Sequence, residues 1–406
     1  MTDTDRMGGP LAGMKVIELA HIMAGPVCGL MLADMGADVV KVEKPDGDDT
    51  RRFLPPDVGG VSSAFLMMNR NKRGIALNLK EPEAVNVLKR LLKDADVVIE
   101  NYRMGTMEKL GLGYETLKEI NPGLIYCEIS GFGRTGPYAN RGGFDLIAQG
   151  MSGLMSITGE GPGRPPVKSG APVSDITAGI LAALGVSAAY ARKLQTGEGQ
   201  RVDTSLFEAA ITHTYWQSAI TFATGRPPGP MGSAHPLNAP YQAFRTADGW
   251  LNVGAANQKN WERMLGVIGA PELGEDPRFA ANNARMNNLE ALTEVLNGKF
   301  SARSTDEWMR LLESAGVPAG PVLDIAEMHR DPQTLAREMV TETEHPLAGP
   351  VKTIGLPIKF SETPGAIERP APRLGEHNRE VLAEVGYGSE AIDCLSASGA
   401  LVSEMD

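Results

Sequence analysis

The stretch MKVIELAHIMAGPVCGLMLADMGADVVKVE, residues 14–43, decides the fold of this chain. Its two ends, MKVIEL (14–19) and ADVVKVE (37–43), are short, rich in β-branched residues and apolar at successive positions, which is typical of strands buried on both faces. The residues between them lead from the first strand into a helix. A strand, a helix and a second strand in this order predict a parallel sheet covered by helices.

The same pattern continues through the first part of the chain. Three further strand-like runs follow, GIALNL (74–79), ADVVIEN (95–101) and LIYCEIS (124–130), and the apolar spacing of EPEAVNVLKRLLKD (81–94) is helical. Strands that alternate with helices in this way predict an α/β fold with a doubly wound, mostly parallel sheet, similar to a Rossmann fold.

The later part of the chain predicts a smaller α+β domain. The Gly/Pro-rich segment RPPGPMGSAHPLNAP (226–240) marks a boundary, a hairpin is expected at 241–255, and helices are expected at 257–269, 288–300 and 305–315. The expected organisation is the N-terminal part of a large α/β domain at 10–205, a linker helix at 206–225, the small domain at 226–335 and a return segment at 336–406 that completes the large domain.

Composition excludes several classes of protein. The chain of 406 residues has 50 acidic and 39 basic side chains, and its formal charge of −11 opposes binding to nucleic acid or anionic lipid. Three widely spaced cysteines predict no disulfide framework and favour a reducing, cytoplasmic location. The opening MTDTDRMGGPLAG has no apolar core, so no secretory leader is expected. The apolar run 176–191 is shorter than the roughly 20 residues that span a bilayer, and we expect a buried helix there.

Common cofactor and catalytic motifs do not occur in the sequence. The turn after the first strand, AHIMAGPVCGL (20–30), has no G-x-G-x-x-G, which argues against a nicotinamide-dependent dehydrogenase. No Walker sequence, H-E-x-x-H pair or G-x-S-x-G elbow occurs either. We therefore expect neither a metal site nor a permanently bound cofactor.

Asp175 has the sequence context of a functional carboxylate. It follows the loop PVKSGAPVS (166–174) and begins a long apolar helix, where free backbone N–H groups and the helix dipole favour a negative charge. An aspartate at such a position is commonly an N-cap. It can also be a nucleophile. Position by itself leaves both alternatives open.

The surrounding motifs resemble those of the class III CoA-transferases, the CaiB/BaiF type that includes the formyl-CoA:oxalate and carnitine enzymes. The resemblance covers nearly the whole chain. Its landmarks are the stretch at 9–51, NRNKRGIALNLK (69–80), the stretch at 95–137, GGFDLIAQGMSGLMSITGE (142–160), GVPAGPV (316–322) and LGEHN (374–378).

This resemblance implies a CoA-transferase in which Asp175 is the nucleophile and carries first an acyl group and then CoA. Oxyanion or loop candidates implied by the family are Met23 and Ala24 in the turn after the first strand, and Gly232 and His235 in the loop before the hairpin. Met23 stands where the formyl-CoA enzyme has a glutamine, so we do not expect oxalate as the substrate. The segment 241–265 looks similar to that of transferases using succinyl-CoA and dicarboxylic acids, which favours such a donor and acceptor.

The family further implies where CoA would lie and how the chain assembles. The residues implied as contacts of CoA are Lys44, Leu77, Asn101, Tyr102, Arg103, Thr106, Lys109 and Leu110. Arg73 and Arg134 are candidates for holding the acceptor's carboxylate, although structural arginines look the same in sequence. An interlocked homodimer is expected, with an acyl-CoA and a carboxylic acid as the small-molecule partners.

An α-methylacyl-CoA racemase is the nearest alternative, since it shares the fold and the coenzyme. Two-base racemisation needs a proton carrier on each face of the reacting carbon. The racemases resemble this chain around GGFDLIAQG (142–150) but have a histidine where Phe144 stands. Phenylalanine cannot carry a proton, which favours transfer over racemisation.

Overall fold

The computed structural model describes residues 8–403, and these form two compact units. The first unit combines residues 8–152, 170–213 and 332–403. The second combines residues 153–169 and 214–331. The short segment 153–169, which precedes the helix of Asp175, therefore belongs with the second unit. The sequence predicted this segment as part of the large domain.

The centre of the first unit is a six-stranded, all-parallel sheet in the described residues. In spatial order its strands are β5 (Lys72–Ala76), β2 (Asp38–Glu43), β1 (Lys15–Glu18), β6 (Val97–Glu100), β7 (Ile125–Ser130) and β8 (Arg201–Ser205). The chain runs outward in one direction from β1 to β5 and then in the other from β6 to β8. This is the order of a doubly wound sheet, and ligands of such sheets bind at the carboxyl ends of the strands near the reversal. The predicted α/β fold class is confirmed.

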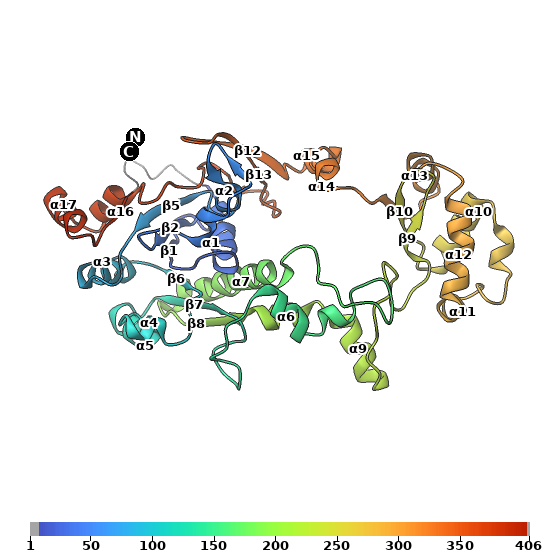
Figure 1. The fold of residues 1–406 in the computed structure, drawn as a ribbon, viewed down its shortest axis with the longest axis horizontal. Coiled ribbons are helices and arrows are strands. Elements are labelled where there is room, and N and C mark those ends of the chain that lie inside the picture. Colours follow the sequence, from blue (N-terminus) through green and yellow to red (C-terminus); the bar gives the residue numbers. More distant parts are fainter. Residues whose placement is uncertain (1–7, 404–406) are drawn as a thin grey trace. The chain divides into compact units, whose positions relative to one another are not determined.

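Helices cover both faces of the sheet, as its apolar strands require. Successive strand residues point to opposite faces. In β1, Val16 belongs to a core cluster with residues of the helices α1 and α7, whereas Ile17 belongs to a cluster with residues of α3 and α16. Figure 1 shows these helices around the sheet. The helices of the first unit are α1 (Ala24–Asp34), α2 (Ser63–Met68), α3 (Pro82–Lys93), α4 (Thr106–Lys109), α5 (Tyr114–Ile120), α6 (Asp145–Met151), α7 (Val173–Thr196), α8 (Leu206–Thr212), α15 (Pro332–Ala336), α16 (Asn378–Glu384) and α17 (Ser389–Ala397).

The C-terminal segment returns to the first unit and packs on its sheet. An isolated bridge pairs Leu401 with Leu77, and the α16 residue Asn378 accepts a hydrogen bond from the backbone of Ala76 (3.0 Å). Two small antiparallel hairpins complete the unit, β3 (Asp57–Val58) with β4 (Val61–Ser62) and β12 (Val340–His345) with β13 (Gly349–Ile354).

The second unit is an α+β arrangement around an aromatic core. Phe244, Phe300 and Trp308 stack within it, and all three are buried. Its elements are the antiparallel strands β9 (Tyr241–Arg245), β10 (Trp250–Gly254) and β11 (Ala319–Pro321), with the helices α9 (Tyr215–Thr224), α10 (Gln258–Ile268), α11 (Asn282–Asn287), α12 (Leu289–Phe300), α13 (Thr305–Ser314) and α14 (Ile325–Met328). The hairpin and the three helices expected at 241–315 are present.

One expectation about local structure is wrong, since the segment 206–225 forms two helices, α8 and α9, which fall into different units. The helix expected at 176–191 is present within the 24 residues of α7, which is long and apolar enough by length and composition to cross a membrane. One face of α7 is buried in the core of the first unit. Its other face exposes Ile180, Leu184 and Leu194. The domain boundaries inferred from sequence stay a prediction, and residues 1–7 of the opening segment lie outside the described residues.

Candidate active site

A cavity of about 260 Å³ opens at the carboxyl ends of the strands β1, β2, β5 and β6. This is the edge at which a doubly wound sheet binds its ligands. Leucine, valine and tyrosine side chains form most of its wall, and lysines and acids stand among them. Its lining residues are Leu19, Ala20, His21, Lys41, Val42, Glu43, Lys44, Pro45, Gly47, Asp48, Leu77, Asn78, Leu79, Lys80, Tyr102, Thr106 and Leu110.

Five of the eight residues implied as CoA contacts line this cavity. They are Lys44, Leu77, Tyr102, Thr106 and Leu110. The other three, Asn101, Arg103 and Lys109, are not among its lining residues. The Asn101 side chain is used elsewhere, since it accepts from the N–H of His21 (3.1 Å) and donates to the carbonyl of His21 (2.8 Å).

Three lysines line the cavity, and one of them, Lys41, is buried in ion pairs with Glu18 and Asp48. The other two differ in their partners. Lys44 is half exposed and pairs with Asp49 (2.8 Å). Lys80 is exposed and has no ion-pair partner within the described residues, so its ammonium group is available to an anion. Sequence reasoning did not single out Lys80, although it closes the landmark NRNKRGIALNLK (69–80) that carried the resemblance.

Asp175 lies in the first turn of α7, and it is not the cap of that helix. The N-cap position is Pro172, and the helix begins at Val173. The capping role falls to Asp145 of α6, which accepts a hydrogen bond from the N–H of Ser174 (2.9 Å) and another from the Gln149 side chain (2.7 Å). No hydrogen bond or ion pair joins the Asp175 carboxylate to any described residue. The N-cap alternative for Asp175 is therefore wrong.

The environment of Asp175 makes its carboxyl group harder to ionise. Burial is the larger cause and the nearby charge of Asp145 the smaller, and together they raise the pKa of Asp175 from 3.8 to about 6. A carboxyl group with this pKa is ionised at neutral pH. Because Asp175 accepts no hydrogen bond from a described residue, no such bond has to break before the carboxylate reacts. These are the properties that a nucleophilic carboxylate needs.

The turn implied as an oxyanion-binding loop lies beside the same end of α7. Met23 is the N-cap of α1, and Ala24 is its first helical residue. Gly179, one turn after Asp175, packs so closely on α1 that a Cβ there would lie 2.6 Å from the Ala24 carbonyl oxygen. The first N–H groups of a helix have no acceptor within it. Those of α1 are therefore free donors at the end of a helix that packs against α7 one turn after Asp175.

The other two loop candidates, Gly232 and His235, belong to the second unit. The imidazole of His235 stacks on Tyr241 (5.1 Å between centroids), and its Nδ1 accepts the N–H of Leu237 (3.1 Å). Burial lowers the pKa of His235, so the ring is neutral at neutral pH and carries its proton on Nε2. Their contribution to the site of Asp175 stays a prediction.

Neither arginine considered for binding the acceptor has a free guanidinium group. Arg73 is buried and pairs with Asp38 (2.6 Å), Glu380 (3.0 Å) and Glu384 (2.7 Å). Arg134 is buried between Glu100 (2.6 Å) and Glu128 (3.0 Å). Both carry structural ion pairs, and the suggestion that either one binds substrate is wrong.

Comparison with known proteins gives the chain a family. The model of CoA-transferase family III matches residues 11–378. Succinate–glutarate CoA-transferase of Agrobacterium fabrum is 42% identical over 392 residues, which cover 95% of this chain and 98% of that one. Succinyl-CoA:glutarate CoA-transferase of Homo sapiens is 38% identical, with 96% of this chain and 89% of the human chain covered. The crystal structure of a CAIB/BAIF family protein from Brucella suis superimposes with a TM-score of 0.83 at 41% identity, covering 93% of this chain and 99% of that chain.

Proposed function

Because the chain belongs to CoA-transferase family III, as its motifs predicted, we propose that it moves CoA from succinyl-CoA to a dicarboxylic acid through intermediates on Asp175. The observation that carries the proposal is the state of this carboxylate. The Asp175 carboxylate is half-buried, and its pKa is raised to about 6. It makes no capping hydrogen bond, because Asp145 accepts the hydrogen bond from the N–H of Ser174 at the start of α7. A structural cap would have the opposite properties.

The proposed reaction consists of acyl and thiol exchanges on one carboxylate. The ionised oxygen of Asp175 attacks the thioester carbonyl of the donor, forming an aspartyl anhydride and expelling CoA thiolate. The thiolate then attacks the aspartyl carbonyl, which forms an enzyme–CoA thioester and releases the donor acid. The acceptor carboxylate reverses these two steps and leaves as its CoA ester. One thioester is consumed and one is made, so the reaction needs no ATP.

The protein's own groups support each step. The free N–H groups at the start of α1 can stabilise the oxyanion that forms when Asp175 attacks. The cavity beyond His21 offers an apolar wall for the adenine ring and the lysines 44 and 80 for the phosphates of CoA. The loop of residues 20–24 connects the cavity, which Ala20 and His21 line, with the start of α1. The coenzyme can extend along this loop.

The choice of a dicarboxylate rests on the relatives. The proteins of A. fabrum and H. sapiens are both named for succinate or succinyl-CoA and glutarate. Acids of this length carry a second carboxylate far from the reacting one, which a transferase can use to distinguish them from acetate or formate.

The test mixes enzyme and succinyl-CoA with isotopically labelled succinate, glutarate, acetate and oxalate, and measures new CoA esters by mass spectrometry. We expect glutaryl-CoA and exchange of label into succinyl-CoA, with little transfer to acetate or oxalate. Intact-mass analysis with donor alone should show an adduct that hydroxylamine removes and that Asp175→Asn does not form. Deuterium uptake at the α-carbon of a branched acyl-CoA without acid exchange would instead indicate the racemase, and would refute the proposal.

We also propose the interlocked homodimer. A single chain leaves large apolar side chains exposed on the outer faces of α6 and α7, with Phe144 73% and Leu184 65% exposed. Contiguous apolar surface of this kind usually marks a contact with another chain. Sedimentation velocity should give a dimer at micromolar concentration, and Leu184→Asp should weaken it. A stable, active monomer would contradict this assignment.

A further inference from the structure

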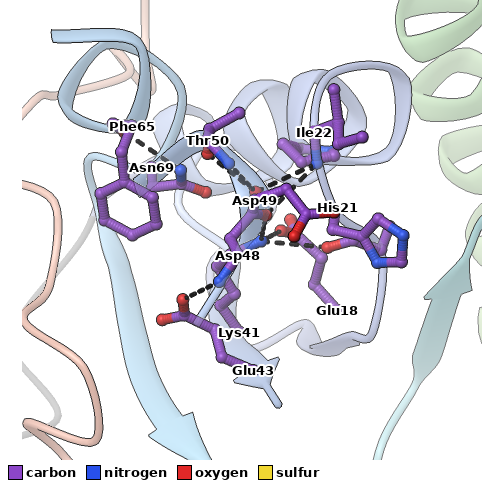
Figure 2. Close-up of polar contacts among 12 residues, drawn as sticks. Glu18, His21, Ile22, Lys41, Glu43, Asp48, Asp49, Thr50, Phe65 and Asn69 are labelled. Carbon is purple, nitrogen blue, oxygen red and sulfur yellow. Dashed lines mark hydrogen bonds and ion pairs between the residues drawn. The ribbon is translucent and has the colours of Figure 1, made fainter. Parts of the chain in front are cut away.

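Four charged side chains lie buried behind the turn that precedes α1. Glu18 ends β1, Lys41 lies on β2, Lys72 begins β5, and Asp48 follows β2, and each is at most 2% exposed. Lys41 lies 3.1 Å from Glu18 and 2.9 Å from Asp48, and Lys72 lies 2.9 Å from Glu18. Two positive and two negative charges balance in this network, which we call the buried charge network. Figure 2 labels three of its members, Glu18, Lys41 and Asp48.

The network bonds to the backbone of the turn at three positions. Lys41 donates to the Ala20 carbonyl (3.0 Å), and Lys72 donates to the Pro26 carbonyl (3.0 Å). Both carboxylate oxygens of Asp48 accept the N–H of Ile22 (3.3 Å each). The turn is therefore attached at its beginning, middle and end to groups that are themselves paired.

The middle attachment holds an unfavourable backbone conformation. Ile22 has φ of +69°, in the left-handed region that β-branched residues rarely adopt. Such a conformation persists only where its surroundings determine it strongly. Asp48 supplies that constraint, and its own position is fixed by Lys41 and by the N–H and hydroxyl of Thr50 (2.9 and 2.8 Å).

Charges within the network favour the ionised states of Lys41 and Asp48, whereas burial lowers the pKa of Lys72 to about 8. Burial lowers the pKa of Lys41, but the charges of Glu18 and Asp48 outweigh burial and raise it. Burial likewise opposes ionisation of Asp48, yet the charge of Lys41 and the hydrogen bonds from Thr50 hold its pKa well below the ordinary value. Gly29 of α1 leaves room for the Glu18 carboxylate, which a Cβ would meet.

We infer that Asp48, held by Lys41, is a positioning residue for the transfer reaction: it fixes the left-handed turn at Ile22 and so aims the free N–H groups of residues 23–25 at the carbonyl that Asp175 attacks. The inference rests on the proposed function. Asp48 also lies in the wall of the cavity proposed for CoA, but it touches neither the acyl group nor Asp175 in this scheme. Its loss should therefore slow acylation at saturating donor by a larger factor than it changes the binding of donor.

The test measures adduct formation on rapid mixing with succinyl-CoA, over a range of donor concentrations, in the full-length enzyme. Asp48→Asn keeps an oxygen for Ile22 but loses the charge, and we expect about a tenfold slower maximal rate; Asp48→Ala should lose about a hundredfold. The donor concentration that gives half of the maximal rate should change less than threefold in both variants.

Asp34→Asn is the matched control. Asp34 is also a buried aspartate in an ion pair, but its partner is Arg70 (2.6 Å) and it lies at the opposite end of α1. Asp34→Asn should leave the rate within twofold, which separates loss of the Asp48 contacts from the general effect of removing a buried carboxylate charge beside α1.

A rescue separates positioning from general damage. Glycine adopts positive φ without the cost that isoleucine pays, so Ile22→Gly added to Asp48→Ala should recover at least threefold of the rate. If Asp48→Ala slows acylation no more than Asp34→Asn, or changes only half-saturation by donor, the inference is overturned while the proposed function stands. Failure of the wild-type enzyme to form any adduct on Asp175 would overturn both.

Discussion

Two aspartates near the beginnings of two neighbouring helices have opposite surroundings. Asp48, behind the start of α1, bonds to Lys41, Thr50 and the backbone of Ile22, and its pKa is lowered. Asp175, in the first turn of α7, has no bonded partner among the described residues, and its pKa is raised to about 6. The difference teaches how one residue type serves two purposes. The carboxylate that holds the fold is surrounded by donors, and the one proposed to react is free of them.

The largest effect expected from this comparison is on turnover. Asp175→Asn should reduce CoA transfer at least about a thousandfold, because the amide cannot form the acyl intermediate. Steady-state assays of glutaryl-CoA formation measure this. Asp48→Asn should reduce the rate of CoA transfer far less. Equal reductions in the two variants would contradict the assignment of Asp175 as the nucleophile and Asp48 as a positioning residue.

The same two variants should change stability in opposite directions. Folding raises the pKa of Asp175, so its ionisation above pH 6 favours the unfolded state, and Asp175→Asn should stabilise the fold at pH 7.5 by about 1–2 kcal/mol after allowance for solvent screening. Folding lowers the pKa of Asp48, so its ionised form stabilises the fold, and Asp48→Asn should cost about 3 kcal/mol. Denaturant unfolding at that pH measures both. A destabilising Asp175→Asn would contradict this account.

The pH dependence of acylation sharpens the comparison further. Asp175 reacts only when ionised, so the rate of adduct formation should be constant above pH 7 and fall about tenfold for each unit below the pKa of about 6. Rapid-quench measurements between pH 4.5 and 8 with saturating donor test this. A rate that stays constant down to pH 4.5 would show that Asp175 has an ordinary pKa or is not the nucleophile.

Asp145 has two roles at the start of α7. Its carboxylate accepts the hydrogen bond that caps the helix, and its negative charge raises the pKa of Asp175. Asp145→Asn keeps an oxygen for the N–H of Ser174 but removes the negative charge that raises the pKa of Asp175, so the acid midpoint should move down by about half a unit. Asp145→Ala should also lose the cap, at about 1 kcal/mol. The same pH profiles and unfolding curves report both. An unchanged midpoint in Asp145→Asn would leave burial as the whole cause of the raised pKa.

The smallest effect expected concerns the cavity beside the buried charge network. Lys80→Ala should raise the KM for succinyl-CoA by about threefold to tenfold, since its unpaired ammonium can meet a phosphate of CoA. Lys93→Ala is the control, because Lys93 is exposed, does not line the cavity and is not among the residues implied as contacts of CoA. Equal effects of the two substitutions would show that the cavity is not where the phosphates bind.

Much of this arrangement could be predicted from the sequence because its signals are local. Strands such as MKVIEL (14–19) and LIYCEIS (124–130) are apolar on both faces, and the motif around Asp175 identified the family. The strand β8 was missed because it is an edge strand whose residues Arg201 and Asp203 are polar. The start of β5 was missed for a related reason, since Lys72 and Arg73 look like surface residues and are buried in ion pairs.

The sequence by itself determined the fold class, the family and the aspartate on which the chemistry is proposed to occur, since periodicity and short motifs are properties of neighbouring residues. Only the tertiary structure decided what each charged side chain does. Asp145 lies 29 positions before Ser174 and caps its helix, and Asp48 lies 26 positions after Ile22 and holds its backbone. Partners of this kind meet only when the chain has folded, and the donors that they bring then decide whether a carboxylate is bonded, as Asp48 is, or free of hydrogen bonds, as Asp175 is.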